Sequence, residues 1–251
     1  GLGGFIASGA LAGPAWESIE EPVFRAEQAL VVALDLSRCM DAQDIEPSRL
    51  ERAKLKIFGL LERRQSGQTA LLVYTANAFT VTPLTDDTDT IAALVSSLST
   101  DIMPSRGSYP EVGIRKGQSL LEQAGVGIGE VLLVTDGGSS PAAQKAARDL
   151  REAGFALSIL GVGTREGAPI PRLAGGFVTD NRGKLAVARL EERGLRDLAA
   201  EGGGQFAVLA ADNSDLDLLL SGEVSAAAAA AADENSLATD QWREEGPWLV
   251  L

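Results

Sequence analysis

The 251-residue chain contains no histidine and a single cysteine, Cys39. Without histidine there is no Ser-His-Asp or Cys-His catalytic group, no imidazole proton shuttle and no His-ligated zinc. A single cysteine excludes an intramolecular disulfide, a CxxC redox pair and a cysteine-rich metal site. Aromatic residues make up only 5%, so the core has to be built from Val, Leu, Ile and Ala. What remains is the chemistry of carboxylate and hydroxyl oxygens and of the hard cations that they bind.

Basic residues are also scarce relative to acidic ones. The chain has 35 Asp and Glu against 22 Lys and Arg, a net charge of −13 and a pI near 4.5. Nucleic-acid binding requires a basic face, so this balance argues against a nucleic-acid partner. With 45% hydrophobic residues the composition is that of a globular protein, and the length indicates one domain, or one domain plus a small appendage.

Two uncharged, apolar segments at the ends differ from this globular composition. Each is shorter than the roughly 20 residues that cross a bilayer. We interpret both as parts of transmembrane helices, with few basic residues nearby, which favours an extracytoplasmic domain between them. At the front, a signal-peptide remnant or a simple buried segment is the alternative. The expected organisation is a first membrane segment at 1–16, a globular domain at 17–222, an Ala-rich stalk or linker at 223–247 and the start of a second membrane segment at 248–251.

Between these ends, short apolar runs alternate with amphipathic stretches. This alternation predicts a doubly wound α/β fold, in which a mostly parallel sheet has helices on both faces. Residues 78–81 follow the strand at 69–74 through a tight turn and are expected to form a short antiparallel edge strand. Residues 164–189 have no helical pattern. There, 176–179 and 184–188 flank a good turn sequence and predict a β-hairpin insertion.

The other expected elements follow from the same patterns. Pro47 is expected to open a helix that buries the apolar residues spaced along one of its faces. The residues of that face are Leu50, Leu55, Phe58 and Leu61. Further strands are expected at 29–36, 131–135, 155–161 and 205–209, and further helices at 88–98, 110–123, 141–153 and 190–200.

Oxygen-bearing side chains occur where three loops meet one edge of the predicted sheet. Asp35 and Ser37 follow the first strand, Asp136 follows the strand at 131–135, and Ser108 precedes the helix at 110–123. Ligands of open parallel sheets bind at the carboxyl ends of the strands, where the strand order reverses. Two carboxylates and two hydroxyls at that edge suit Mg²⁺ or a similar ion. Taken singly, these residues could instead cap loops or form ordinary turns.

The spacing Asp35-x-Ser37-x-Cys39, together with Ser108 and Asp136, resembles the metal-ion-dependent adhesion site of von Willebrand factor A domains. The resemblance extends over about residues 28–210. Within that family, several short segments are similar to the BatB-like, membrane-anchored bacterial proteins associated with aerotolerance operons. These segments are 47–53, 83–87, 102–104, 160–164 and 245–248.

The resemblance implies a binding function without chemical turnover. In such a site Asp35, Ser37, Cys39, Ser108 and Asp136 would hold Mg²⁺ or Mn²⁺, and one coordination position would take an Asp or Glu carboxylate of a protein partner. Other A-domain membrane proteins or a MoxR-type ATPase system are the partners that it suggests. It also implies a bacterial inner-membrane protein whose periplasmic domain assembles or maintains an envelope complex linked to stress or aerotolerance.

Cys39 departs from the family pattern, which has a serine at this position. A thiol is a poor ligand for hard Mg²⁺. Either the site is weakened and the domain is a metal-independent scaffold, or water replaces the missing hydroxyl. We expect Cys39→Ser to raise the affinity for Mg²⁺ or Mn²⁺. As a lone cysteine, Cys39 could also be an inert small apolar residue or a redox sensor.

An enzyme of the Mg²⁺-dependent haloacid dehalogenase type is a further alternative. These phosphatases have a second Asp two residues after the first, where this chain has Ser37, and so the acid–base partner is missing. Acidic residues near the predicted site are expected to form a solvated rim or to attract a basic partner. They are Asp41, Asp44, Glu46, Asp86, Asp87 and Asp89.

Overall fold

The computed structural model describes residues 28–64, 66–172, 174–179 and 182–221. The two expected membrane segments and the Ala-rich stalk lie outside the described residues. Among the residues that are described, no helix is both long and apolar enough to cross a membrane.

A six-stranded sheet in the order β3-β2-β1-β4-β5-β8 forms the centre of the molecule. All neighbouring strands are parallel except β2 and β3, which form the expected antiparallel edge pair. The apolar runs of the central strands are buried on both faces, which is why they lack polar alternation. The strands are β1 (Gln28–Asp35), β2 (Gln68–Tyr74), β3 (Ala78–Thr85), β4 (Ile128–Thr135), β5 (Ala156–Gly161) and β8 (Gly203–Val208).

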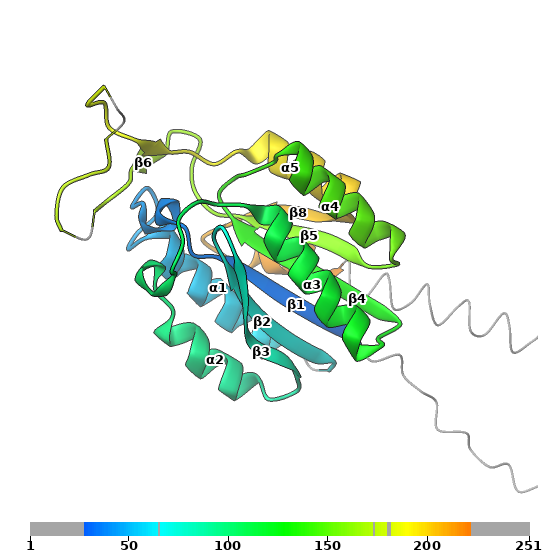
Figure 1. Cartoon of the computed structure of the whole chain (residues 1–251). Coiled ribbons are helices and arrows are strands. Elements are labelled where there is room, and N and C mark those ends of the chain that lie inside the picture. Colours follow the sequence, from blue (N-terminus) through cyan, green and yellow to red (C-terminus); the bar gives the residue numbers. More distant parts are fainter. Residues whose placement is uncertain (1–27, 65, 173, 180–181, 222–251) are drawn as a thin grey trace, which may run out of the picture.

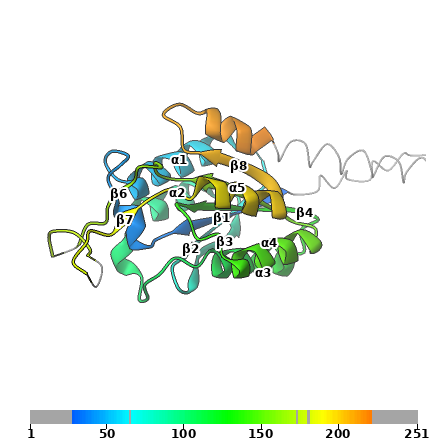
Figure 2. The same cartoon turned by 90° about the horizontal axis from the view of Figure 1, so that it is seen from above.

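Helices cover both faces of the sheet, so the doubly wound α/β prediction is confirmed (Figures 1 and 2). One core cluster lies between the sheet and α3, α4 and α5. The other lies between the opposite face and α1, α2 and a helical segment at 214–221. The helices are α1 (Arg49–Arg63), α2 (Thr88–Ser97), α3 (Pro110–Ala124), α4 (Pro141–Glu152) and α5 (Glu192–Glu201).

The first helix differs in detail from the prediction. It begins at Arg49 after Ser48, whose hydroxyl accepts a hydrogen bond from the backbone N–H of Glu51 and so caps the helix. Leu55, which we expected in the core, is 55% exposed. Leu50 and Leu61 are buried as predicted, and Ala53, Ile57 and Leu60 lie on the same buried face.

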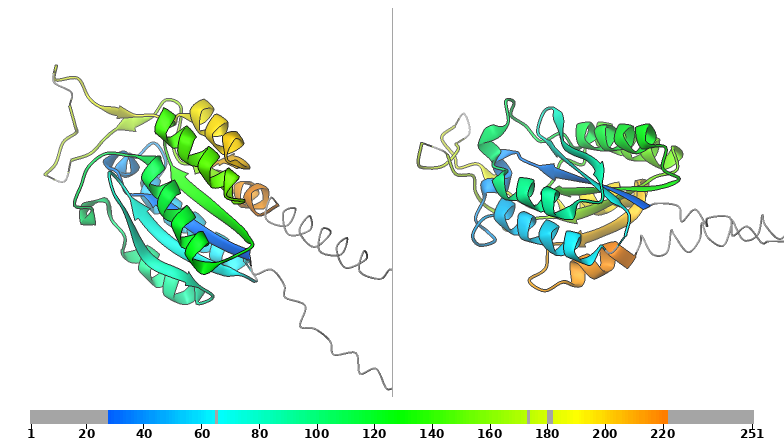
Figure 3. Two further views of the ribbon diagram at one scale, coloured as in Figure 1. Left: turned by 45° about the vertical axis from the view of Figure 1, so that its right-hand side comes forward. Right: turned by 90° about the horizontal axis from the view of Figure 1, so that it is seen from below.

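The expected hairpin insertion is present as a small separate sheet. Its regular pairing, between β6 (Ala168–Pro169) and β7 (Val187–Ala188), lies at the base. Two isolated antiparallel bridges, Pro171 to Phe177 and Thr179 to Leu185, lie farther along the insertion. The predicted hairpin is therefore confirmed, and residues 176–179 do pair in part with 184–188, since the N–H of Ala186 also donates to the carbonyl of Val178. The prediction missed the regular pairing of β6 with β7 at the base. The hairpin extends away from the body of the domain, at the end opposite to the start of β1 and the end of the helical segment at 214–221 (Figures 1 and 3).

Candidate metal and partner-binding site

Asp35, the last residue of β1, is fully buried and lies at the centre of the candidate site. Its Oδ1 accepts a hydrogen bond from the backbone N–H of Ser37 at 2.7 Å. Its Oδ2 accepts from the hydroxyls of Ser108 at 2.6 Å and Thr135 at 2.8 Å. Burial raises the pKa of Asp35, while these hydrogen bonds act to lower it. This carboxylate thus joins the loop after β1 to Ser108, which the sequence placed on a separate loop, and to Thr135 at the end of β4.

The Ser37 hydroxyl is buried, yet it has no hydrogen-bond partner of normal geometry. It lies close enough to Asp35 and Cys39 to oppose, in small part, the rise that burial causes in the pKa of both groups. The hydroxyl of Tyr74, whose pKa is raised by burial and by nearby Asp35, also lacks a partner. Since buried polar atoms are almost always satisfied, two unpartnered hydroxyls near one carboxylate fit a site for a water molecule or a cation.

Cys39 lies next to this group, in the 3₁₀ turn at Arg38–Asp41. Burial, with Asp136 and Asp35 adding to it, raises the pKa of the Cys39 thiol to about 12. The thiol is therefore neutral near pH 7 and a weak ligand. Within the described part of the chain, no group of three or more His, Cys, Asp or Glu side chains is placed to hold a metal ion. A cation here would depend on the serine hydroxyls.

Arg49, at the start of α1, is fully buried and crosses the candidate site. Its Nη1 donates a hydrogen bond to Asp136 at 2.6 Å. Its Nε and Nη2 each donate to the carboxylate of Asp44 at 2.7 Å, and Nη2 also donates to the carbonyl of Ala188 at 2.9 Å. Asp44 in turn accepts from the N–H and hydroxyl of Thr164. One guanidinium thus joins the end of β4, the loop before α1 and the base of the hairpin.

Asp136, directly after β4, is the second carboxylate of the site. Burial and the neighbouring charge of Asp35 raise its pKa to about 7, although Arg49 acts to lower it. Glu191 adds to this rise. The Glu191 side chain accepts a hydrogen bond from the N–H of Gly138 at 3.0 Å, and its own N–H donates to the carbonyl of Asp136 at 2.9 Å. The loop after β4 is therefore fixed by Arg49 through the Asp136 side chain and by Glu191 through the backbone.

Comparison with known proteins relates this geometry to a family. A profile described as von Willebrand factor type A domain matches residues 30–139. A BatB protein from Bacteroides thetaiotaomicron is 32% identical, with a TM-score of 0.72, over 80% of this chain and 98% of that one. The chain belongs to the von Willebrand factor type A domain family. An aerotolerance-related membrane protein from Bacteroides fragilis is similar to this A domain at 30% identity, with a TM-score of 0.72, over 77% of this chain and 97% of that one.

More distant structures resemble the A domain in fold alone. The PilB minor pilin from Streptococcus sanguinis is 14% identical, with a TM-score of 0.51, over 88% of this chain and 63% of that one. No curated protein matches the sequence.

The A domain has site residues that sequence reasoning missed. Arg49 could have been suspected, because a basic residue in the first turn of a helix opposes the helix dipole and needs another reason to be there. Thr135 gave no signal beyond its place at a strand end. Asp44, expected in a solvated rim, is instead buried against Arg49. Burial acts to raise the pKa of Asp44, but Arg49 and Thr164 outweigh it and lower the pKa.

Two other members of the expected acidic rim also have structural partners. Asp87 accepts a hydrogen bond from the N–H of Thr90 and caps α2. Asp41 accepts from the hydroxyl of Thr100 and faces Arg38. The rim prediction was therefore wrong for Asp44 and incomplete for these two, because a short acidic side chain in a loop is often used by the local backbone.

Proposed function

We propose that this A domain binds a protein partner through a divalent cation, Mg²⁺ or Mn²⁺. The ligands would come from the set Asp35, Ser37, Cys39, Ser108 and Asp136, and a carboxylate of the partner would complete the coordination. The buried, unpartnered hydroxyl of Ser37 beside Asp35 is the observation that carries this proposal, since a coordinated cation or its water would satisfy it.

The donor set favours binding over catalysis. Ser37 and Ser108 are neutral ligands, so a cation that they hold keeps much of its charge and attracts an anionic group. The hydroxyl of Ser108 donates to Asp35 and retains lone pairs for a cation. At the position where a haloacid dehalogenase phosphatase has its acid–base Asp, the A domain has Ser37.

Calorimetric titration of the purified protein with MnCl₂ tests the cation. We expect one site in the wild type and loss of the binding heat in Ser37→Ala. Ser97→Ala, on the exposed side of α2, is the matched control and should titrate like the wild type. Equal titrations for all three proteins would contradict a site at Ser37.

A metal-independent scaffold is the second candidate function. It is favoured by the Arg49 guanidinium, which already supplies positive charge to Asp136, and by the neutral thiol at position 39. A pull-down from membranes in Mg²⁺ and again in EDTA separates the two functions. Partner recovery that is lost in EDTA supports the cation, and equal recovery supports the scaffold.

We further propose that the domain is tethered to a bacterial inner membrane, lies in the periplasm and serves an envelope complex. One similar structure is described as an aerotolerance-related membrane protein. Other A-domain membrane proteins and a MoxR-type ATPase system are the partners to test first. Protease added to intact spheroplasts should digest the domain, whereas a cytoplasmic domain would be protected.

A further inference from the structure

The segment that contains the hairpin and the start of α5 is locally basic, although the chain as a whole is acidic. Residues 165–196, which include the hairpin and the start of α5, contain seven Arg and Lys against four Asp and Glu, whereas the whole chain has 22 against 35. Four arginines of this segment lie at the hairpin base and on the first turns of α5, and we call them the basic strip. The basic strip consists of Arg165, Arg189, Arg193 and Arg196.

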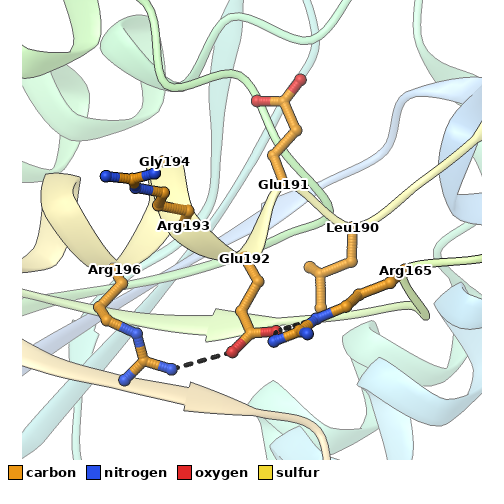
Figure 4. Close-up of a pocket in the computed structure, with 7 residues that line it drawn as sticks. All are labelled: Arg165, Leu190, Glu191, Glu192, Arg193, Gly194 and Arg196. Carbon is orange, nitrogen blue, oxygen red and sulfur yellow. Dashed lines mark hydrogen bonds and ion pairs between the residues drawn. The ribbon is translucent and has the colours of Figure 1, made fainter.

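Part of the basic strip borders an open pocket of about 520 Å³. Glu192 lies between Arg165 and Arg196 and pairs with both, at 2.6 Å and 3.0 Å (Figure 4). The side chains of Arg193 and Glu191 point away from this ion pair. On the floor of the pocket two guanidinium groups thus share one carboxylate, and the Arg193 guanidinium lies at its border.

Arg189 and Arg193 differ from the other two arginines of the basic strip. Both are exposed, and neither forms an ion pair with any residue that the structure describes. Arg193 also lies in the first turn of α5, where the helix dipole disfavours a positive charge. The described contacts of these two arginines do not explain their charge. Their guanidinium groups are therefore available to an anionic partner.

The basic strip is continuous with the candidate metal site. Ala188, next to Arg189, accepts a hydrogen bond from Arg49, which also binds Asp136. Glu191, two residues farther along, donates its N–H to the carbonyl of Asp136.

We propose that the basic strip binds an acidic segment of the partner protein, rich in Asp and Glu, that flanks the carboxylate bound at the site. This rests on the proposed function and adds the chemical character of the partner. Charge complementarity is the argument: the exposed guanidinium groups of Arg189 and Arg193 attract an anionic segment and would not attract a neutral or basic one.

Fluorescence anisotropy with a labelled 12-residue peptide of alternating Gly and Asp tests this proposal, on the full chain in detergent. We expect the double variant Arg189→Glu/Arg193→Glu to bind at least about tenfold more weakly, since each reversal replaces an attraction with a repulsion. Arg151→Glu, at the far end of α4, is the matched control and should bind like the wild type. A Gly-Asn peptide should not bind, and an unchanged circular dichroism spectrum verifies folding of each variant.

Repeating the titration in Mg²⁺ and in EDTA separates the two proposals. If the double variant binds the peptide like the wild type and binding still requires Mg²⁺, the proposal for the basic strip is contradicted and the proposed function is supported. If EDTA does not change peptide binding but the double variant loses it, the proposal for the basic strip is supported and the proposed role of the cation is contradicted. If the peptide does not bind and sedimentation shows a dimer that the double variant abolishes, the strip contacts a second copy of the chain, and our proposal is overturned.

Discussion

At the level of single residues, Arg49 has the largest structural effect on the site. Burial acts to lower the pKa of Arg49, but Asp44 and Asp136 outweigh burial and raise it, so the guanidinium stays charged. Gly163, with a φ of +134°, lies so close that a Cβ there would come within 2.6 Å of the guanidinium carbon. The glycine is thus required both by its backbone conformation and by the space that Arg49 fills.

Replacing Arg49 with methionine should destabilise the domain strongly. The change leaves Asp44 and Asp136 buried without their counter-charge, which for a broken buried pair costs about 3–5 kcal/mol. Urea unfolding measures the loss. Arg52→Met, half-buried one turn along α1, is the control and should change the free energy of unfolding by less than about 1 kcal/mol. Equal midpoints for the two variants would contradict the role of Arg49.

Cys39→Ser should increase the affinity for Mg²⁺. The substitution replaces a neutral, soft thiol, whose pKa of about 12 keeps it protonated, with a hydroxyl that is a harder ligand. Calorimetric titration of the two proteins with MgCl₂ gives the comparison. Indistinguishable titrations would show that position 39 does not contact the cation.

Affinity for the cation should also rise with pH. Asp136 has a pKa of about 7, so at pH 6 most of it carries a proton that cation binding has to displace, and at pH 8 most of it is ionised. We therefore expect the affinity for Mn²⁺ to rise about tenfold from pH 6 to pH 8, because metals bind the deprotonated ligand. Asp136→Asn should remove this dependence. A wild-type dissociation constant that is the same at both pH values would rule out the coupling.

At the level of elements, the helical segment at 214–221 is attached to the sheet through α1. Lys56 pairs with buried Asp215 at 2.7 Å and also donates to the carbonyl of Asp212. Leu216 and Leu219 complete the attachment by packing into the core on that face. This last segment therefore depends on a charged pair as well as on apolar contacts.

Lys56→Met should lower the free energy of unfolding by about 3–5 kcal/mol, because it leaves the carboxylate of Asp215 buried and unpaired. The same substitution at Lys145, whose pair with Asp149 is exposed, provides the control. There we expect a change within about 1 kcal/mol. Chemical denaturation of both variants distinguishes them, and equal losses would mean that burial of the pair is unimportant.

The elements that could be predicted from sequence are those whose signal is local. The run at 29–36 and the run at 131–135 are uninterrupted and apolar, and both form buried strands that end at the site. Asp35 and Asp136 followed from those strand ends. Arg49 could not be placed, because its hydrogen bond to Asp136 spans 87 residues and no local pattern encodes that distance. The prediction that Leu55 is buried was wrong, because amphipathic spacing fixes a helix face only to within one position.

At the level of the whole molecule, one sheet separates two apolar clusters. Leu133 faces the cluster under α3, α4 and α5, and Leu34 faces the cluster under α1 and α2. Neighbouring strand residues thus contribute to different cores, and the sheet backbone is common to both. Loss of either core exposes a face of the same strands.

Leu133→Ala and Leu34→Ala should each lower the free energy of unfolding by about 2–5 kcal/mol, as for other fully buried leucines. Unfolding should remain a single transition in both variants, because neither core is stable without the shared sheet. Far-ultraviolet circular dichroism in urea measures this. Two separated transitions in either variant would show that the cores are independent.

The start of β1 and the end of the helical segment at 214–221 lie on the side of the molecule opposite to the hairpin (Figure 1). The candidate site lies at the other end of β1, whose eight residues span roughly 26 Å. If both ends were anchored to one surface, the candidate site would lie on the side of the domain that faces away from that surface. A partner would then have to approach from the far side, at a height set by the length of one strand.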